Sequence, residues 1–201
     1  TITNWEPGKV EWFDAPLNPA APEGPSRKVP FTGELLIERA DFMEDAPKKY
    51  FRLKPDGEVR LKYTYIIKCN EVVKDAEGNV VELKCTYDPS TRPGSGEWRS
   101  VKGTIHWVSA SHAKEVELRL YDKLFTEPEM GSIPEGKDYK EYLNPDSLKV
   151  TSGFAEPALL EDKSGLAVQF ERVGYFFKDP DSTPEHFVYN KTTALKDSFK
   201  F

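Results

Sequence analysis

Hydrophobic and polar residues alternate along most of the chain. In the segment at 58–73, apolar side chains occupy the odd positions from Val59 to Cys69 and polar ones the even positions between them, with Ile66 as the exception. This period of two predicts a half-buried β-strand. The segment KDAEGN then predicts a turn, and residues 80–88 alternate again. We expect a long antiparallel hairpin in which Cys69 and Cys85 are near cross-strand neighbours.

Further strands are predicted from KGTIHWVSA at 102–110, VELRLYDKLF at 116–125 and GLAVQFERVGYFF at 165–177. Helix signals are few. Residues 40–53 predict about two turns interrupted by Pro47, SASHA at 109–113 predicts one or two turns, and the proline-rich residues 15–31 predict an extended connector. Many short strands with turn signals between them are typical of all-β barrels or sandwiches, and the length suits two small barrels or one large sheet system.

Composition narrows the class of protein. The chain has 201 residues, of which 38% are hydrophobic and 31% charged, with a net charge of −6. No apolar run is long enough for a membrane span. Dedicated nucleic-acid binders are usually basic, although a basic face can lie on an acidic body. Two cysteines without a CxxC motif fit free thiols in a reducing compartment, and a single disulfide between them is the alternative. Because the chain starts at Thr1 in a predicted strand, we expect a fragment of a longer protein.

The histidines do not predict a metal site. His106 and His112 are six residues apart, from a strand into a turn, and His186 lies in another loop beside Glu185. Metal ligands favour a spacing of four on a helix or two on a strand, with a third ligand nearby. The chain also lacks a GxSxG elbow, a P-loop and a GxGxxG motif. We expect no catalytic or metal-binding residues.

Basic and planar side chains gather on three predicted strands instead. Arginine, glutamine and glutamate have forked donors or acceptors that match base edges, and tyrosine or phenylalanine can stack on unpaired bases. This pattern indicates RNA binding, while an ordinary solvated strand face is the alternative. The three segments are KKYFRL at 48–53, EVRLKY at 58–63 and QFER at 169–172.

Read in order, ten phrases resemble the anticodon-binding region of bacterial-type glutaminyl-tRNA synthetases, over residues 16–199. They are VPFTGELLIERADF, KKYFRL, GEVRLKYTYIIKC, DAEGNVVELKCTYDP, VKGTIHWVSASHA, VELRLYDKLF, LNPDSL, GFAEPALLE, VQFERVGYFF and FVYNKTTALKDSF. The resemblance implies an all-β fold of two small antiparallel six-stranded β-barrels with a few short helices. A proximal barrel would comprise residues 1–40 plus 121–201, and a distal barrel residues 41–120.

The resemblance also implies which residues meet the anticodon. Arg60 matches the arginine that holds the first base, with Lys62 as a second basic position nearby. Arg52 matches the arginine at the third base, with Lys49 and Tyr50 beside it.

In the same way, Gln169 matches the glutamine that reads the middle uracil, with Glu171 and Arg172 next to it. Pro19 falls in the connector that approaches the loop, and Lys196 lies near the C-terminus. Some positions depart from the family pattern: Lys49 replaces glutamine, Phe51 replaces lysine, Ala20 replaces asparagine and Lys196 replaces arginine. The family's arginine that caps the middle uracil would lie upstream of Thr1.

For function, the resemblance implies the anticodon-binding part of a class I glutamine–tRNA ligase in the cytoplasm. Its partners would be the tRNA for glutamine and the catalytic domain of the same polypeptide, as a monomer without membrane contact. ATP with Mg would belong to that catalytic domain, and this chain alone would hold no cofactor and would not be catalytic. Two alternatives stay open: the corresponding part of a glutamyl-tRNA synthetase, and a free-standing RNA-binding β-barrel protein.

Overall fold

The structure is a computed structural model that describes residues 1–95 and 99–195. Contacts between residues divide the chain into two compact units. Unit 1 comprises Thr1–Ala113 with Glu156–Leu159, and unit 2 comprises Lys114–Ala155 with Leu160–Phe201. These bounds differ from the predicted division, which placed residues 1–40 with residues 121–201.

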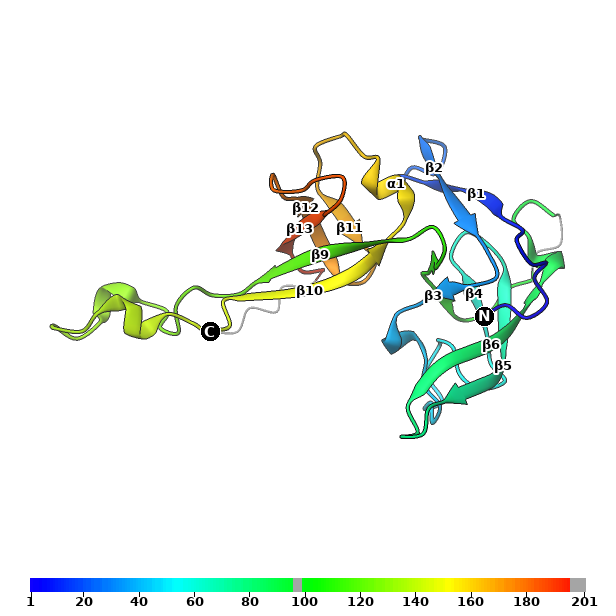
Figure 1. The fold of residues 1–201 in the computed structure, drawn as a ribbon, viewed down its shortest axis with the longest axis horizontal. Coiled ribbons are helices and arrows are strands. Elements are labelled where there is room, and N and C mark those ends of the chain that lie inside the picture. Colours follow the sequence, from blue (N-terminus) through cyan, green and yellow to red (C-terminus); the bar gives the residue numbers. More distant parts are fainter. Residues whose placement is uncertain (96–98, 196–201) are drawn as a thin grey trace. The chain divides into compact units, whose positions relative to one another are not determined.

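Unit 1 contains three small sheets (Figure 1). One sheet pairs β1 with β2, a second pairs β3 with β8, and a third has the strand order β6-β5-β4-β7. Two short 3-10 helices, Arg39–Asp41 and Pro89–Thr91, connect the strands. The strands are β1 Glu11–Pro16, β2 Ser26–Phe31, β3 Leu35–Leu36, β4 Glu58–Leu61, β5 Ile66–Lys74, β6 Val80–Asp88, β7 Thr104–Ile105 and β8 Val108–Ser109.

The core of unit 1 is aromatic. The ring centroid of Phe31 lies 4.8 Å from Trp5, 5.4 Å from Tyr65 and 5.2 Å from Trp107. Phe13 also contacts Tyr65, with ring centroids 5.4 Å apart. Rings packed edge to face add specific attraction to the burial of apolar area. Because β1 and β2 supply Phe13 and Phe31 to this core, residues 1–40 belong with residues 41–113.

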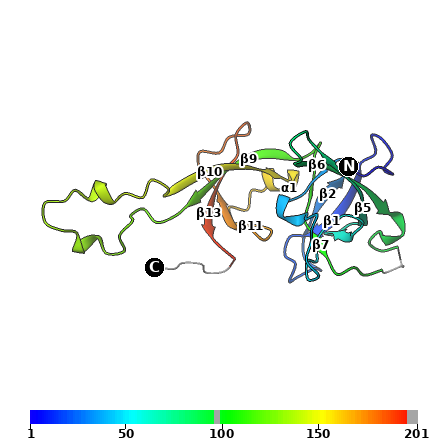
Figure 2. The ribbon, with the colours of Figure 1, turned by 90° about the horizontal axis from the view of Figure 1, so that it is seen from below.

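Unit 2 is built on one five-stranded sheet with the order β10-β9-β13-β12-β11. Its core contains Val116, Phe176 and Tyr189, and Phe170 packs on Phe176 with ring centroids 4.6 Å apart. Figure 2 shows β9 and β10 as a long hairpin whose connection carries two 3-10 helices, Met130–Ser132 and Tyr139–Tyr142. The strands are β9 Lys114–Tyr121, β10 Leu148–Ala155, β11 Val168–Phe170, β12 Gly174–Lys178 and β13 Val188–Thr193. The short helix α1, Pro157–Leu160, belongs to unit 1 except for its last residue.

The predicted fold class is confirmed, because the described residues are mostly strands with a few short helices. The sheets are open, however, with two, five, two and four strands, rather than two closed six-stranded barrels. No helix in residues 1–95 or 99–195 is long and apolar enough to cross a membrane.

The hairpin predicted around the two cysteines is confirmed. Strands β5 and β6 pair antiparallel with Cys69 opposite Cys85, and both are buried free thiols. The predicted strand over residues 58–73 is instead two strands, β4 and β5, which pair with each other. They turn at Tyr63, whose φ of 67° is left-handed, and the Thr64 hydroxyl donates to the Leu61 carbonyl at 3.2 Å.

Three local predictions were wrong. Residues 40–53 form no helix beyond the single 3-10 turn that ends at Asp41. KGTIHWVSA forms two short strands in different sheets rather than one, since β7 pairs with β4 and β8 pairs with β3. The proline-rich residues 15–31 end β1, make a loop and form β2, so they are a hairpin and not an extended connector. SASHA makes one turn, in which Ala113 N donates to Ser109 O at 2.8 Å.

Candidate nucleic-acid interface

Residues 47–53 form a loop that is fixed to the 3-10 turn at Arg39–Asp41. Tyr50 Oη and Arg52 Nη1 both donate to the Ala40 carbonyl at 3.0 Å. Arg52 Nε also lies 3.3 Å from Oδ1 of the buried Asp41, and 38% of the Arg52 side chain is exposed. The guanidinium therefore balances a buried carboxylate and still reaches solvent. Lys49 is exposed on the same loop.

Arg60, on β4, is tied to three backbone carbonyls. Its Nη1 donates to Thr64 O at 2.8 Å and to Thr91 O at 3.2 Å, and its Nη2 donates to Arg99 O at 2.9 Å. Burial, together with the nearby charge of Arg99, lowers the pKa of Arg60. An arginine stays protonated in proteins, so Arg60 is a fixed cation. It holds the turn after β4 and the segment after β6 together.

Lys62 lies in the turn between β4 and β5, beside the strained Tyr63. The Lys62 ammonium is 5.3 Å from the Tyr63 ring centroid, and the Arg27 guanidinium is 5.9 Å from it. Trp107 Nε1 donates to the Lys62 carbonyl at 3.1 Å, which fixes this turn against the core. Strain of this kind clusters at functional sites. Two cations, Lys62 and Arg27, thus lie near one aromatic ring, and the family resemblance assigns Lys62 to the anticodon.

Gly103 joins the loop at 47–53 to β4. Its carbonyl accepts from Arg60 N at 2.9 Å. A Cβ placed on Gly103 would lie 2.4 Å from Phe51 O and 3.1 Å from a methyl of Val59. Only glycine allows such a close approach. The main chain at Phe51 and the main chain at Arg60 therefore lie on either side of Gly103.

Pro19 is in the loop between β1 and β2. The residue is exposed, and the loop is ordered by a hydrogen bond from Ala20 N to Asn18 Oδ1 at 2.9 Å. Unit 1 thus carries Pro19 together with the predicted residues on 47–62.

In unit 2, three predicted residues fall on the β11–β12 hairpin. Gln169 is exposed on β11, opposite Tyr175, and Glu171 and Arg172 form the turn. Val173 N closes the turn on Phe170 O at 3.0 Å, and Arg172 has a left-handed φ of 62°. Arg172 therefore lies at a tight turn, and it is exposed. Lys196 lies outside the described residues.

The structure groups the predicted residues by unit. Lys49, Tyr50 and Arg52 share one loop, Arg60 and Lys62 follow on and after β4, and Gln169, Glu171 and Arg172 share one hairpin. Three side chains beside them were not assigned to the anticodon: Tyr63, Phe51 and Lys102. Period-two alternation predicted Tyr63 as an inward strand residue, so it hid the turn that presents this ring.

The three histidines contact neighbouring polar or acidic side chains. His106 Nε2 is 3.4 Å from Glu38, His112 Nδ1 is 3.0 Å from the Ser111 hydroxyl, and His186 Nε2 is 3.2 Å from Glu117. The described residues contain no group of three or more His, Cys, Asp or Glu side chains that could hold a metal ion.

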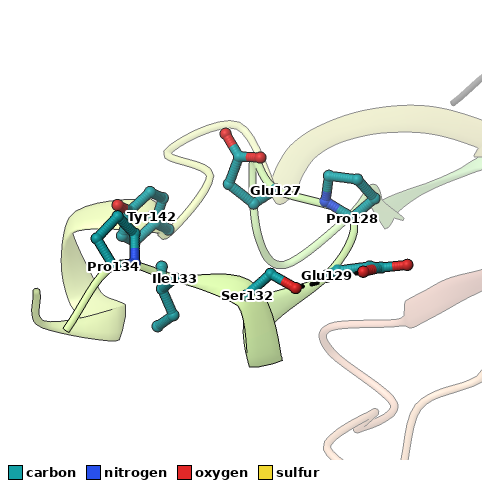
Figure 3. Close-up of a pocket in the computed structure, with 7 residues that line it drawn as sticks. All are labelled: Glu127, Pro128, Glu129, Ser132, Ile133, Pro134 and Tyr142. Carbon is teal, nitrogen blue, oxygen red and sulfur yellow. Dashed lines mark hydrogen bonds between the residues drawn. The ribbon is translucent and has the colours of Figure 1, made fainter.

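One shallow cavity of about 390 Å³ lies in the connection between β9 and β10 (Figure 3). No residue predicted to meet the anticodon lines this cavity. Its lining residues are Glu127, Pro128, Glu129, Ser132, Ile133, Pro134 and Tyr142.

Exposed forked and cationic side chains on strands and tight turns of two all-β units are features of proteins that bind unpaired nucleic acid. Two family models with the same description, anticodon-binding domain of class I tRNA synthetases (E and Q), match residues 1–88 and 104–179. The chain belongs to this family.

The similar proteins are glutamine–tRNA ligases. The chain is 50% identical to the Rhodopirellula baltica protein over 99% of this chain and 33% of that protein. It is 48% identical to the Nitrobacter hamburgensis protein over 98% of this chain and 35% of that protein, and 48% identical to the Escherichia coli O1:K1 / APEC protein over the same shares. The chain therefore spans about a third of the length of the curated relatives it matches.

Proposed function

We propose that this chain is the anticodon-binding part of a glutamine–tRNA ligase, and that it binds unpaired bases in the anticodon loop of the tRNA for glutamine. The observation that carries the proposal is the similarity to glutamine–tRNA ligases, which extends over 99% of the chain at 50% identity. The positions of the forked and cationic side chains on exposed turns support it. The alternatives are a glutamyl-type synthetase and a free-standing RNA-binding protein.

The chemistry of the side chains suits three separate bases. Base edges in a loop can be read only when the bases are unstacked. A guanidinium can donate two bonds to O6 and N7 of guanine, which suits Arg52 at the third anticodon base of the glutamine tRNA. An amide offers both a donor and an acceptor, which suits Gln169 at a uracil. Arg60 and Lys62 would then hold the first base and the nearby phosphates.

Catalysis and ATP binding would belong to the other two thirds of a protein as long as the relatives. The proposed ligase attaches glutamine to its tRNA, and ATP with Mg would act in the catalytic domain. That domain would be a second partner of this chain. We propose a monomeric protein in the cytoplasm, where its tRNA is found.

The test is a binding titration with labelled stem-loop RNAs. The glutamine loop carries G at the third anticodon position, whereas the glutamate loop carries C. We expect the glutamine loop to bind about 5- to 150-fold more tightly, the range for one well-read base. Equal affinity for the two loops, or tighter binding of the glutamate loop, would contradict the glutamine assignment.

Arg52→Lys tests the proposed role of the fork. Lysine keeps a cation near the buried Asp41 carboxylate but lacks the planar fork. We expect R52K to lose most of the preference for G over C while it keeps its fold, which is checked by tryptophan fluorescence. Lys149→Ala is a control for the loss of an exposed cation, because Lys149 lies on β10 and is not among the residues assigned to the anticodon. It should leave the preference unchanged.

A further inference from the structure

Phe51 is an exposed aromatic side chain in the middle of the proposed interface of unit 1. Half of its surface, 50%, is open to solvent. It lies between Tyr50 and Arg52, both of which are fixed to the Ala40 carbonyl. A single exposed aromatic residue needs no explanation by itself. The surroundings of Phe51 set it apart.

First, the loop around Phe51 is held on both sides. On one side, Tyr50 and Arg52 bond to Ala40, and Leu53 N donates to Asp41 O at 3.0 Å. On the other side, the main chain of Phe51 packs directly on Gly103, with no room for a Cβ. A ring on such a loop is presented in a fixed position, which lowers the entropy cost of binding.

Second, a cation accompanies the ring. The ammonium of the exposed Lys102 lies 5.6 Å from the Phe51 ring centroid. Lys49 and Lys48 are exposed two and three residues before Phe51. An aromatic face with lysines around it suits a nucleotide, because the base stacks on the ring while the ammonium groups attract the phosphates.

We propose that Phe51, with Lys102 beside it, is a stacking platform for the base at the third anticodon position. This inference rests on the proposed function and names a contact within it. Stacking is tolerant of base identity, so Phe51 would add affinity while the neighbouring Arg52 would supply the choice of base. The family pattern, with lysine at this position, offers a charge but no ring.

The experiment uses this chain and the glutamine stem-loop RNA with 2-aminopurine placed at each anticodon position in turn. The fluorescence of 2-aminopurine is quenched when it stacks. We expect the wild-type chain to hold a quenched base at the third position and Phe51→Ala to lose that quenching. With the unlabelled loop, F51A should bind about 5- to 150-fold more weakly. Phe51→Trp should retain affinity, and the emission of its new tryptophan should be quenched when the RNA binds.

Controls separate stacking from other effects. Phe154→Ala removes a phenylalanine of similar exposure, 55%, from β10 and should leave affinity unchanged. Lys102→Gln should reduce the dependence of affinity on salt by about one phosphate contact. Phe51→Leu keeps an apolar side chain without a flat ring, and it should resemble F51A.

Two outcomes overturn the inference: F51A binding as tightly as wild type, or quenching at the third position that persists in F51A. In either case RNA binding itself remains, so the proposed function stands. A wild-type chain that binds the anticodon stem-loop no better than an unrelated hairpin would instead refute the proposed function.

Discussion

Arg60 should stabilise unit 1 as well as contact RNA. Its guanidinium donates to the carbonyls of Thr64, Thr91 and Arg99, at 2.8, 3.2 and 2.9 Å. Arg60→Met keeps the apolar stem and removes these three bonds. Hydrogen bonds from charged donors contribute about 1.5–3 kcal/mol each when buried. Two of these bonds are only part-buried and one is exposed, so we expect a total loss of about 2–4 kcal/mol.

Arg99→Met is the matched control. Arg99 also makes three hydrogen bonds, but its partners are the carboxylates of Glu58 and Asp88, and 42% of its side chain is exposed. Exposed ion pairs contribute about 0–1 kcal/mol. The two variants therefore remove the same residue type, and they differ in burial and in the kind of acceptor.

Urea unfolding followed by tryptophan fluorescence measures the stability of unit 1, which contains Arg60. All four tryptophans fall within residues 1–113, so their emission reports unit 1. We expect the midpoint to fall clearly in R60M and by much less in R99M. Equal midpoints for R60M and wild type would refute the structural role of Arg60. Any loss of RNA binding in R60M would then be a direct loss of contact.

Three further predictions concern unit 1. Gly103→Ala should lower the stability of unit 1 by about 1–3 kcal/mol, because the new Cβ would lie 2.4 Å from the Phe51 carbonyl oxygen. Gly33→Ala, whose Cβ would have its nearest contact at 3.5 Å, should have little effect, and urea unfolding compares the two variants. A thiol reagent at pH 8 should react with Cys69 and Cys85 only as the protein unfolds, because both are buried and burial raises the pKa of Cys85 to about 12; rapid labelling of the folded chain would contradict this. The pKa of Cys85 is raised from 9.0 in the folded state, so folding favours the neutral thiol. The contribution of Cys85 to the free energy of unfolding is therefore complete below pH 9 and is lost as the pH rises toward 12. Over this range the urea midpoint of wild type should fall more steeply than that of Cys85→Ala.

Alternation predicted the strands that have one buried face and one exposed face. The β5–β6 hairpin could be predicted, because KDAEGN has turn residues and Cys69 and Cys85 fall on the same face. The break between β4 and β5 could not, because the turn contains no glycine or proline. Tyr63 takes a left-handed φ there, held by the hydrogen bond from the Thr64 hydroxyl and by Trp107. Tertiary contacts override the local preference at this point.

The grouping of strands into units also depends on contacts distant in sequence. Phe31 falls in the predicted connector at 15–31, and only the packing of Phe13 on Tyr65 and of Phe31 on Tyr65 and Trp107 shows that both belong to unit 1. The candidate site shows the same limit. The sequence pattern identified Arg52 and Arg60 as forked cations, but it gave no sign that both are bound to backbone carbonyls. It also gave no sign that Gly103 would bring Lys102 to Phe51.

The most direct test of anticodon recognition is a titration of this chain with the glutamine tRNA in which the anticodon loop is either open or paired to a complementary oligonucleotide. If unstacked bases are the ligand, pairing them should abolish tight binding and leave only a weak, strongly salt-dependent association with phosphates. An unchanged Kd for the paired loop would contradict the reading of unpaired anticodon bases by this chain.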